Sequence, residues 1–373
     1  MAIKIFIAGD VVPVNRTVNL FKEKRTQQLF GEMISEIKNS DISIVNLECP
    51  IVMGNVKPIE KCGPALKTTS ETVEVLKEVG FTHVSLANNH FFDYGQHGVE
   101  DTIRTCQLLN ILTVGGGRNV NQARRIEYVH IEKKCIAIIN ACEHEFSIAT
   151  ETHGGSNPLD IIQMDDDLME ARKNADYIIL ILHGGVEHYK YPTPRMKRWF
   201  HHFIDMGADA IINHHQHCFS GYEVYNEKPI FYGLGNFCFD TLWSQPLADW
   251  KYGYAVRLLL DKEIGFEIIP YEQCGEQPTI IIREKDGFTK EIAKLNSTIR
   301  DDFILYQKFN DYVIGKEKEI LLNLSPFKNK FFDALLKRGV FGKVYRKSQV
   351  FNIKNKLYCE AHNDVLKQLF MLI

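Results

Sequence analysis

Short apolar runs recur along the first three quarters of the chain, and most of them end in polar side chains. The pattern is clearest in the segments 3–10, 42–48, 83–87, 177–185 and 208–215, which are rich in Ile, Val, Leu and Ala. Runs of this length, bounded by polar or glycine residues, predict β-strands that are largely buried. Hairpins are expected at 126–141, with a turn at 132–134, and at 221–237 and 253–271.

Amphipathic segments separate these apolar runs. The segment 69–80 begins with a capping residue at Thr69 or Ser70 and stops at Gly80, as a helix would. Further helices are expected at about 26–39, 98–110, 168–175 and 195–207. Helices that alternate with strands predict a layered α/β fold in which helices cover the sheets.

The pattern changes at about Glu284. From there on the sequence is helix-like, with charged residues on one side and no strand periodicity. We therefore divide the chain into a main domain, residues 1–283, and a helical C-terminal extension, residues 284–373. The extension is expected either to pack on the main domain or to form an interface between copies of the chain.

Composition narrows the class of protein. The chain has 373 residues, 45% hydrophobic and 24% charged, and its net charge of −3 argues against a general nucleic-acid or anionic-membrane binder. The nine cysteines include no CxxC pair, so we expect reduced cysteines without a disulfide framework or a Cys-type zinc site.

The first residues form a strand rather than a signal peptide, and no apolar stretch reaches the roughly 18 residues of a membrane span. A cytoplasmic location is expected.

Side chains that can bind metal ions gather where the predicted strands end. Taken singly, each has an ordinary explanation, because an aspartate after a strand is often a turn residue and a histidine in an apolar strand is often hydrogen-bonded in the core. Five strands that all end this way favour a shared site, since ligands of layered α/β proteins bind beyond the carboxyl ends of the strands. The residues are Asp10, Asn46, Glu48, Asn89, His90, Asp93, His183, His215 and His217.

The types of these side chains indicate which ions could bind. Carboxylates, an amide oxygen and imidazoles, without thiolates, suit Mn²⁺, Fe²⁺ or Zn²⁺. Two carboxylates, one asparagine and three histidines are too many ligands for one tetrahedral site. They suit two divalent ions that share a bridging ligand.

The order of these motifs resembles the calcineurin-like metallophosphoesterases and, more closely, the bacterial capsule-synthesis CapA (poly-γ-glutamate synthesis) family. The resemblance covers roughly residues 1–275 and implies an α/β/β/α sandwich of two stacked mixed sheets flanked by helices. It is carried by the segments "GDVV", "NLECP", "LANNHFFDYG", "LHGGVEHYKYP", "GADAIINHHQH" and "YGLGNFCFD".

The resemblance also implies roles for individual residues. Asp10 falls on a ligand of the first metal, Glu48 takes the place of a bridging aspartate, and Asn89 falls on a ligand of the second metal. His90 falls on the histidine that assists the leaving group, with Asp93 as the residue that orients its ring. The remaining imidazole ligands are His183, His215 and His217.

Three further residues are candidates for contact with the substrate, namely Asn46, Glu187 and Asn236. A solvent-exposed loop explains Glu187 equally well, and a turn explains Asn236. His214 is left out of the ligand set.

The chain departs from the family pattern in the first motif, where the usual second histidine is missing, as it generally is in the CapA branch. Gly184 and His188 also stand where the branch commonly has tryptophan and tyrosine. Because these changes lie beside the expected pocket, the family's substrate does not transfer to this chain.

This set of residues, together with what the family resemblance implies, leaves three functions open. The first is a metal-dependent hydrolase, acting on a phosphoester in capsule or poly-γ-glutamate biosynthesis. The second is an amide hydrolase or transferase acting on a γ-glutamyl polymer, since an amide oxyanion also needs stabilisation. The third is a non-catalytic assembly protein, which would have no need of the whole ligand set.

Overall fold

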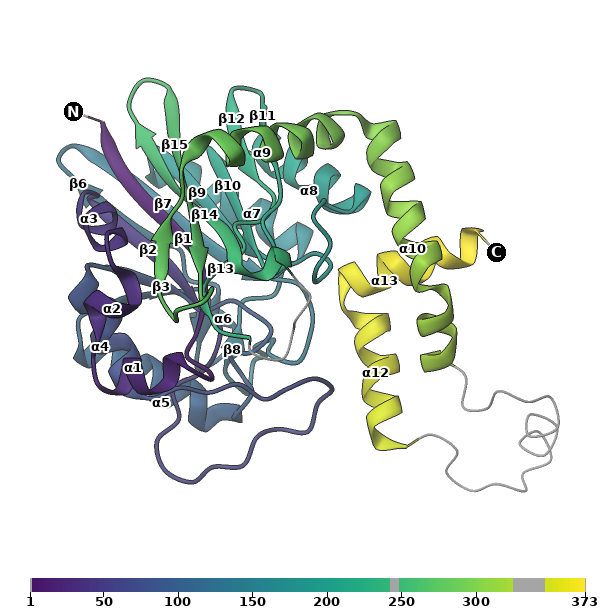
Figure 1. Ribbon diagram of the computed structural model, residues 1–373, viewed down its shortest axis with the longest axis horizontal. Coiled ribbons are helices and arrows are strands. Elements are labelled where there is room, and N and C mark those ends of the chain that lie inside the picture. Colours follow the sequence, from purple (N-terminus) through teal and green to yellow (C-terminus); the bar gives the residue numbers. More distant parts are fainter. Residues whose placement is uncertain (1, 242–247, 325–345, 373) are drawn as a thin grey trace.

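Two stacked β-sheets with helices on both outer faces form the body of the protein (Figure 1). The computed structural model describes residues 2–241, 248–324 and 346–372. The parallel strands at the centre of both sheets come from the apolar runs of the sequence, since strands covered on both faces need apolar residues on both.

The larger sheet has the strand order β16-β15-β14-β1-β2-β3-β4, and β13 also pairs with β1. The strands β1 to β4 are parallel to one another, whereas β14, β15 and β16 pair antiparallel. Their bounds are β1 (Ile3–Val12), β2 (Ile42–Leu47), β3 (His83–Ser85), β4 (Leu112–Val114), β13 (Asn236–Phe239), β14 (Tyr252–Leu260), β15 (Ile264–Gln273) and β16 (Ile280–Ile282).

The smaller sheet has the order β11-β12-β10-β9-β7-β6, with β7, β9, β10 and β12 parallel. Its strands are β6 (Glu127–Ile131), β7 (Lys134–Cys142), β9 (Tyr177–His183), β10 (Ala210–His214), β11 (Tyr222–Tyr225) and β12 (Lys228–Phe231). A separate two-stranded ribbon pairs β5 (Gly116–Gly117) with β8 (Gly155–Ser156).

Alternation along β1 shows how the layers form. Ile5 and Ile7 pack into the core between the two sheets, whereas Phe6 and Ala8 pack into the core beneath the helices that cover the larger sheet. A second outer core lies between the smaller sheet and its helices. These cores separate four layers, so the predicted α/β/β/α sandwich is confirmed.

Helices cover the outer face of each sheet. The larger sheet is covered by α1 (Thr17–Lys22), α2 (Thr26–Phe30), α3 (Met33–Lys38), α4 (Ser70–Val79) and α5 (Gly95–Leu108). The smaller sheet is covered by α7 (Ile161–Asn174) and α8 (Pro194–Asp205). Two short elements complete this part, α6 (Val120–Ala123) and the 3₁₀ helix η1 (Ala248–Lys251).

Two predicted elements differ from the structure. The helix expected at 26–39 is two short helices, because Gly31 between them has φ 48°, outside the helical range. The first strand does not end at Asp10 but continues to Val12. Asp10 lies within β1 at a point where the pairing shifts register towards both β2 and β13.

The region after residue 284 is helical, as predicted, over its described residues; 325–345 and 373 lie outside them. It contains α9 (Lys285–Arg300), α10 (Asp302–Leu324), α12 (Lys347–Tyr358) and α13 (Glu360–Leu372). Phe288 and Ile292 of α9 pack into the core between the sheets. The helices α10 and α13 share a further core with Val186 and Tyr189, and α12 packs against both of them without a buried residue of its own. The boundary at 283 stays a prediction.

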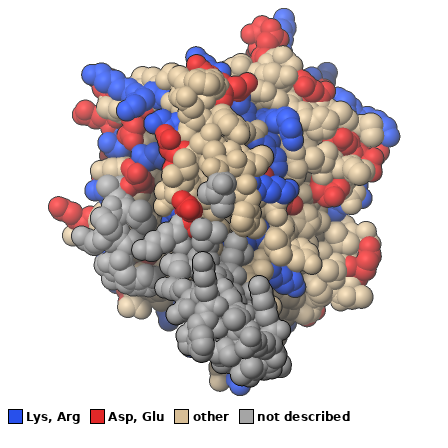
Figure 2. Space-filling view, turned by 90° about the vertical axis from the view of Figure 1, so that its right-hand side faces the viewer, with Lys and Arg blue, Asp and Glu red and all other residues tan. Residues whose placement is uncertain are grey.

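These helices also define one face of the molecule. Figure 2 shows that face. Among its described residues, basic side chains (blue) and acidic side chains (red) are interspersed. None of the helices in the described part of the chain has the length and apolar character that crossing a membrane requires.

Candidate metal centre

The centre lies where strands of both sheets end. In the larger sheet Asp10 is the register partner of Asn46, and in the smaller sheet His183 is the register partner of His214. Parallel pairing places the carboxyl ends of β1 and β2, and of β9 and β10, side by side. Residues far apart in the sequence therefore meet at one edge of the sandwich.

Two groups of side chains in this region could each hold a metal ion. The first contains Asp10, Glu48 and His217, and the second contains Glu48, His183 and His215. Within each group one ligand atom per residue lies within 4.8 Å of the others, and all five residues are buried. Glu48 belongs to both groups, which is the position of a bridging ligand.

Asn89 lies next to the second group. Its Oδ1 is 3.1 Å from Nε2 of His183, and Nδ1 of His215 is 3.1 Å from the same nitrogen. An amide oxygen and two imidazole nitrogens therefore point to one place. All six residues predicted as metal ligands are brought together.

Unsatisfied polar atoms test whether these residues fit a cation. Oδ2 of Asp10 and both carboxylate oxygens of Glu48 are buried and accept no hydrogen bond within the described structure. Glu48 is 0% exposed. Buried carboxylate oxygens without a partner are costly, and a bound cation removes that cost. The donor set fits divalent ions of the Mn, Fe and Zn class.

The electrostatics of the cluster agree with this fit. Burial raises the pKa of Glu48 well above its usual value. Burial would raise that of Asp10 too, but the adjacent imidazoles of His214 and His217, whose Nδ1 atoms lie 3.4 and 3.5 Å from its carboxylate oxygens, hold the pKa of Asp10 well below its usual range. Burial would lower the pKa of His217, yet Glu48 and Asp10 raise it to about 10. The carboxylates of Asp10 and Glu48 therefore favour positive charge in their part of the cluster.

The other two imidazoles behave differently. Burial lowers the pKa of His183 and of His215 well below the usual value. Both are therefore neutral near pH 7, and a neutral imidazole is the form that binds a metal.

The loop after β10 presents its histidines through an unusual backbone. His215 and His217 have φ values of 93° and 55°, in the left-handed region that non-glycine residues rarely adopt. Such conformations cost on the order of 1–3 kcal/mol each and cluster at functional sites. Here they direct the side chains of His215 and His217, which lie two positions apart in one short loop, into the two ligand groups.

Two of the predicted substrate-contact residues lie behind the ligands. Asn46 donates to Oδ1 of Asp10 at 2.7 Å, and Nδ2 of Asn88 donates to Oδ1 of Asn46 at 3.2 Å. Oδ1 of Asn236 lies 2.9 Å from Nδ1 of His217. Asn236 is the first residue of β13 rather than part of a turn. Both amides are in place to hold metal-binding side chains.

His90 and Asp93 are in contact, and a third residue joins them. Nδ1 of His90 lies 2.7 Å from Oδ2 of Asp93 and 3.1 Å from Nζ of Lys61, and Lys61 also pairs with Asp93. The side chain of Lys61 is only 4% exposed. Asp93 accepts a further hydrogen bond, from the backbone of Leu66. Burial lowers the pKa of His90, although Asp93 opposes this.

Glu187, the third predicted substrate-contact residue, is exposed and lines a pocket beside the centre. Next to it, His188 packs with its ring centroid 6.2 Å from that of His217, and Trp250 packs 4.9 Å from His217. The surroundings of the first ligand group are therefore aromatic on one side.

Sequence reasoning missed three residues. His214 has Nδ1 3.4 Å from Oδ1 of Asp10, and Glu145 has Oε1 3.7 Å from Nε2 of His215. Glu145 follows the end of β7, so the rule that polar residues gather at strand ends could have found it. Lys61 lies in an irregular loop with no periodic signal, and nothing in the pattern indicates it.

The fold and the centre define a class: an α/β/β/α protein with two groups of candidate metal ligands at the strand ends. A family model described as bacterial capsule synthesis protein PGA_cap matches residues 4–241. The chain belongs to this family, and the resemblance read from the motifs is confirmed.

Two relatives agree with this assignment. The chain is 32% identical to the capsule biosynthesis protein CapA of Bacillus anthracis, over 84% of this chain and 79% of that protein. It is also 32% identical to the PGA biosynthesis protein CapA of Bacillus subtilis (strain 168), over 64% of this chain and 63% of that protein. A solved structure described as a novel phosphatase of Mycoplasma pneumoniae aligns with a TM-score of 0.47 and 16% identity, covering 78% of this chain and 97% of that one.

Proposed function

We propose that this protein is a metal-dependent hydrolase that acts on a phosphoester in capsule or poly-γ-glutamate biosynthesis. The observation that carries the proposal is Glu48, a buried carboxylate that belongs to both ligand groups and has both oxygens unsatisfied. Two divalent ions bound there would activate a water molecule and stabilise negative charge on the substrate. We expect a cytoplasmic protein.

The ligands are assigned to two positions. Asp10, Glu48 and His217 would hold one ion, and Glu48, Asn89, His183 and His215 would hold the other. Asn46 and Asn236 fix the orientation of Asp10 and His217, so their part in substrate binding is indirect. Hydrogen bonds from such supporting residues raise metal affinity typically by about 10–100-fold.

His90 is proposed to give a proton to the departing group. Asp93 accepts a hydrogen bond at Nδ1 of the ring, which leaves Nε2 as the nitrogen that faces a substrate. Lys61 pairs with Asp93 and holds that carboxylate in place. A positioned proton donor of this kind contributes typically about 10²–10⁴-fold to the rate.

The same residues could serve a second reaction, hydrolysis or transfer at an amide of a γ-glutamyl polymer. A purely structural role in capsule assembly is disfavoured, because a scaffold gains nothing from buried, unsatisfied carboxylates.

The test is a substrate panel with the purified full chain. Metal content is measured first, and turnover of phosphoesters and γ-glutamyl peptides is then followed with Mn²⁺, Fe²⁺ or Zn²⁺ present. We expect turnover of phosphoesters that is lost in Glu48→Gln and kept in the surface control His130→Ala. Turnover of the peptides alone would identify the amide reaction. Less than about 0.2 equivalents of metal after reconstitution, a small fraction of the two ions expected, would exclude the proposal.

A further inference from the structure

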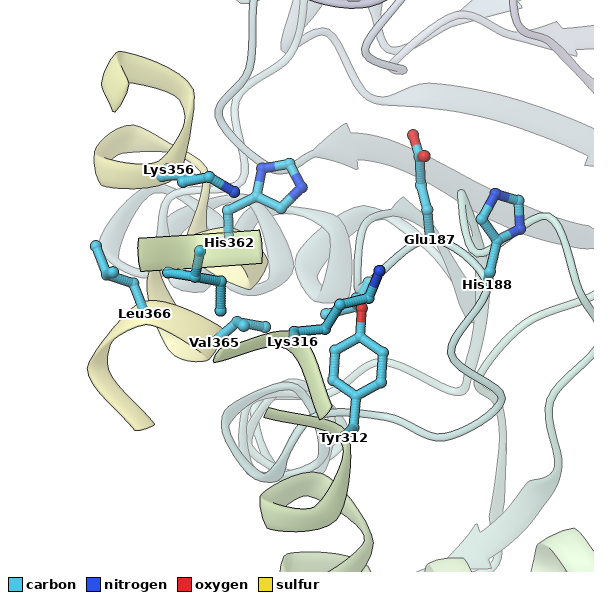
Figure 3. A pocket seen from close by; sticks show the side chains of 10 residues that line it. Glu187, His188, Tyr312, Lys316, Lys356, His362, Val365 and Leu366 are labelled. Atoms are coloured by element: carbon cyan, nitrogen blue, oxygen red, sulfur yellow. The ribbon is translucent and has the colours of Figure 1, made fainter. Parts of the chain in front are cut away.

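A pocket of about 200 Å³ lies between the loop after β9 and the C-terminal helices (Figure 3). One wall carries Glu187 and His188, next to the candidate metal centre. The opposite wall is built from α10, α12 and α13. The helical region thus covers the site of the same chain.

The helical wall is basic. Lys316 comes from α10, Lys356 from α12 and His362 from α13, and all three line the pocket. Figure 3 shows the ammonium ends of both lysines directed into the space between the helices and Glu187. Among the described residues, Lys356 forms no ion pair, so its charge is not compensated by the protein. Two lysines that face one small pocket favour an anion inside it.

The pocket adjoins the metal centre through a chain of polar contacts. Nε2 of His215 lies 3.7 Å from Oε1 of Glu145, and Oε2 of Glu145 accepts from Asn355 at 3.3 Å. Asn355 in turn lies 3.2 Å from Nδ1 of His362. A ligand in the pocket therefore lies beside the second group of metal ligands.

The helices are held in place by specific contacts with the loop after β7. His144 and Glu360 pair at 2.6 Å, and the backbone of Ala361 donates to Glu143 at 3.2 Å. Asp364 also pairs with Arg195, at 2.6 Å. These contacts fix the position of Lys356 and His362 relative to the strand ends.

We infer that the pocket binds a second anionic group of the substrate, a carboxylate or a phosphate, while the metal centre holds the group that reacts. This inference rests on the proposed function. It implies a substrate with at least two anionic groups, and it makes the C-terminal helices part of the site. Glu187, the carboxylate of the pocket lining, lies on the wall beside the metal centre, across the pocket from the two lysines.

Anion binding tests the inference without turnover. Inorganic phosphate and glutarate are titrated calorimetrically into the metal-free full chain. The double variant Lys316→Ala/Lys356→Ala is compared with Lys308→Ala/Lys354→Ala, which removes two exposed lysines from the same helices. We expect the pocket variant to bind at least about tenfold more weakly, as the loss of charged hydrogen bonds implies. The control should bind as the wild type does.

The outcomes distinguish a subsite for phosphate from a subsite for carboxylate. Tighter binding of phosphate identifies a phosphate subsite, and tighter binding of glutarate identifies a carboxylate subsite. Binding of neither anion, or an equal loss in both double variants, would overturn the inference. The single variant Lys356→Met, which keeps the bulk of the side chain, gives the same comparison if the double variant does not fold.

Kinetics then separates this inference from the proposed function. With phosphoester turnover established, the pocket variant should raise KM for 3-phosphoglycerate at least about tenfold and leave KM for nitrophenyl phosphate unchanged. Equal changes for both substrates would contradict a second subsite. If no substrate is turned over but the lysine-dependent binding persists, the proposed function fails and the anion pocket stands.

Discussion

The metal centre and the anion pocket lie side by side but are built in different ways. The ligands of the centre come from strands and the residues directly after them, and hydrogen bonds such as that between Asn46 and Asp10 fix them. The pocket is lined by a loop and three helices, whose polar side chains there are half-buried or exposed and whose apolar side chains are buried. Reactive groups thus occupy the rigid part of the molecule, and recognition is left to a part that can vary independently.

This difference separates two kinds of experiment. Changes in the strand-end residues should affect metal binding and chemistry whatever the substrate is. Changes in α10, α12 and α13 should affect only the choice of substrate and the stability of these helices, which cover the site. The following tests are arranged from the largest expected effect to the smallest.

Replacement of the shared carboxylate should have the largest effect. Glu48→Gln removes a ligand from both groups, so we expect metal content to fall from about two ions per chain to near zero. His215→Ala should remove only the ion of the second group. Elemental analysis of protein purified without chelators measures both.

The adjacent His214 offers a matched control, since it lies outside both ligand groups. His214→Ala should keep metal in both positions. Loss of metal from His214→Ala but not from His215→Ala would show that the wrong histidine has been assigned.

Replacement of the proposed proton donor should affect rate rather than metal content. His90→Ala should lower turnover by roughly 10²–10⁴-fold on substrates with poor leaving groups, and by less on a nitrophenyl ester. Asp93→Asn should show a smaller loss in the same direction. If His90→Ala instead loses metal, the histidine is a ligand.

The buried ion pair next to His90 should contribute to stability. Lys61→Met leaves the carboxylate of Asp93 buried without its cation, which costs about 3 kcal/mol of unfolding free energy. Chemical denaturation measures this change, and Lys57→Met, an exposed position of the same loop, serves as control. Equal stability of the two variants would mean that Lys61 is not part of the site.

Weakening the helical cover should leave the centre intact. Leu369 is fully buried in the core that α10 and α13 share with Val186 and Tyr189, and Leu369→Ala should cost about 2–3 kcal/mol locally. Hydrogen exchange should speed up in 347–372 and stay unchanged in β1, β9 and β10. Phe370→Ala, at an exposed neighbouring position, should change neither. Loss of metal from Leu369→Ala would contradict the independence of the two regions.

The sequence allowed the two regions to be predicted to different extents. The strands of both sheets and the gathering of polar side chains at their ends could be predicted, because apolar runs specify buried strands and parallel strands end at one edge. The true end of β1 could not, because a register shift at Asp10 carries no mark in the residue pattern. Lys61 was missed since its position depends on the path of a loop.

The pocket could not be predicted either. The pattern of residues 284–373 predicted helices but gave no indication of their packing, because amphipathic faces do not specify which partner they cover. Lys356 and Glu187 line the same pocket although they are 169 residues apart in sequence. Self-association through these helices stays a prediction.

The contacts between the loop after β7 and α13 have a consequence for synthesis of the chain. Glu143 and Ala361 are 218 residues apart in sequence. At a translation rate of about 5–20 residues per second, roughly 10–40 s pass between their emergence from the ribosome. Late in that interval, once Ile282 of β16 has emerged, every strand of both sheets in the described part of the chain is made, whereas α12 and α13 are not. The proposed metal site is therefore still open in the nascent protein before α12 and α13 arrive to close the pocket over it.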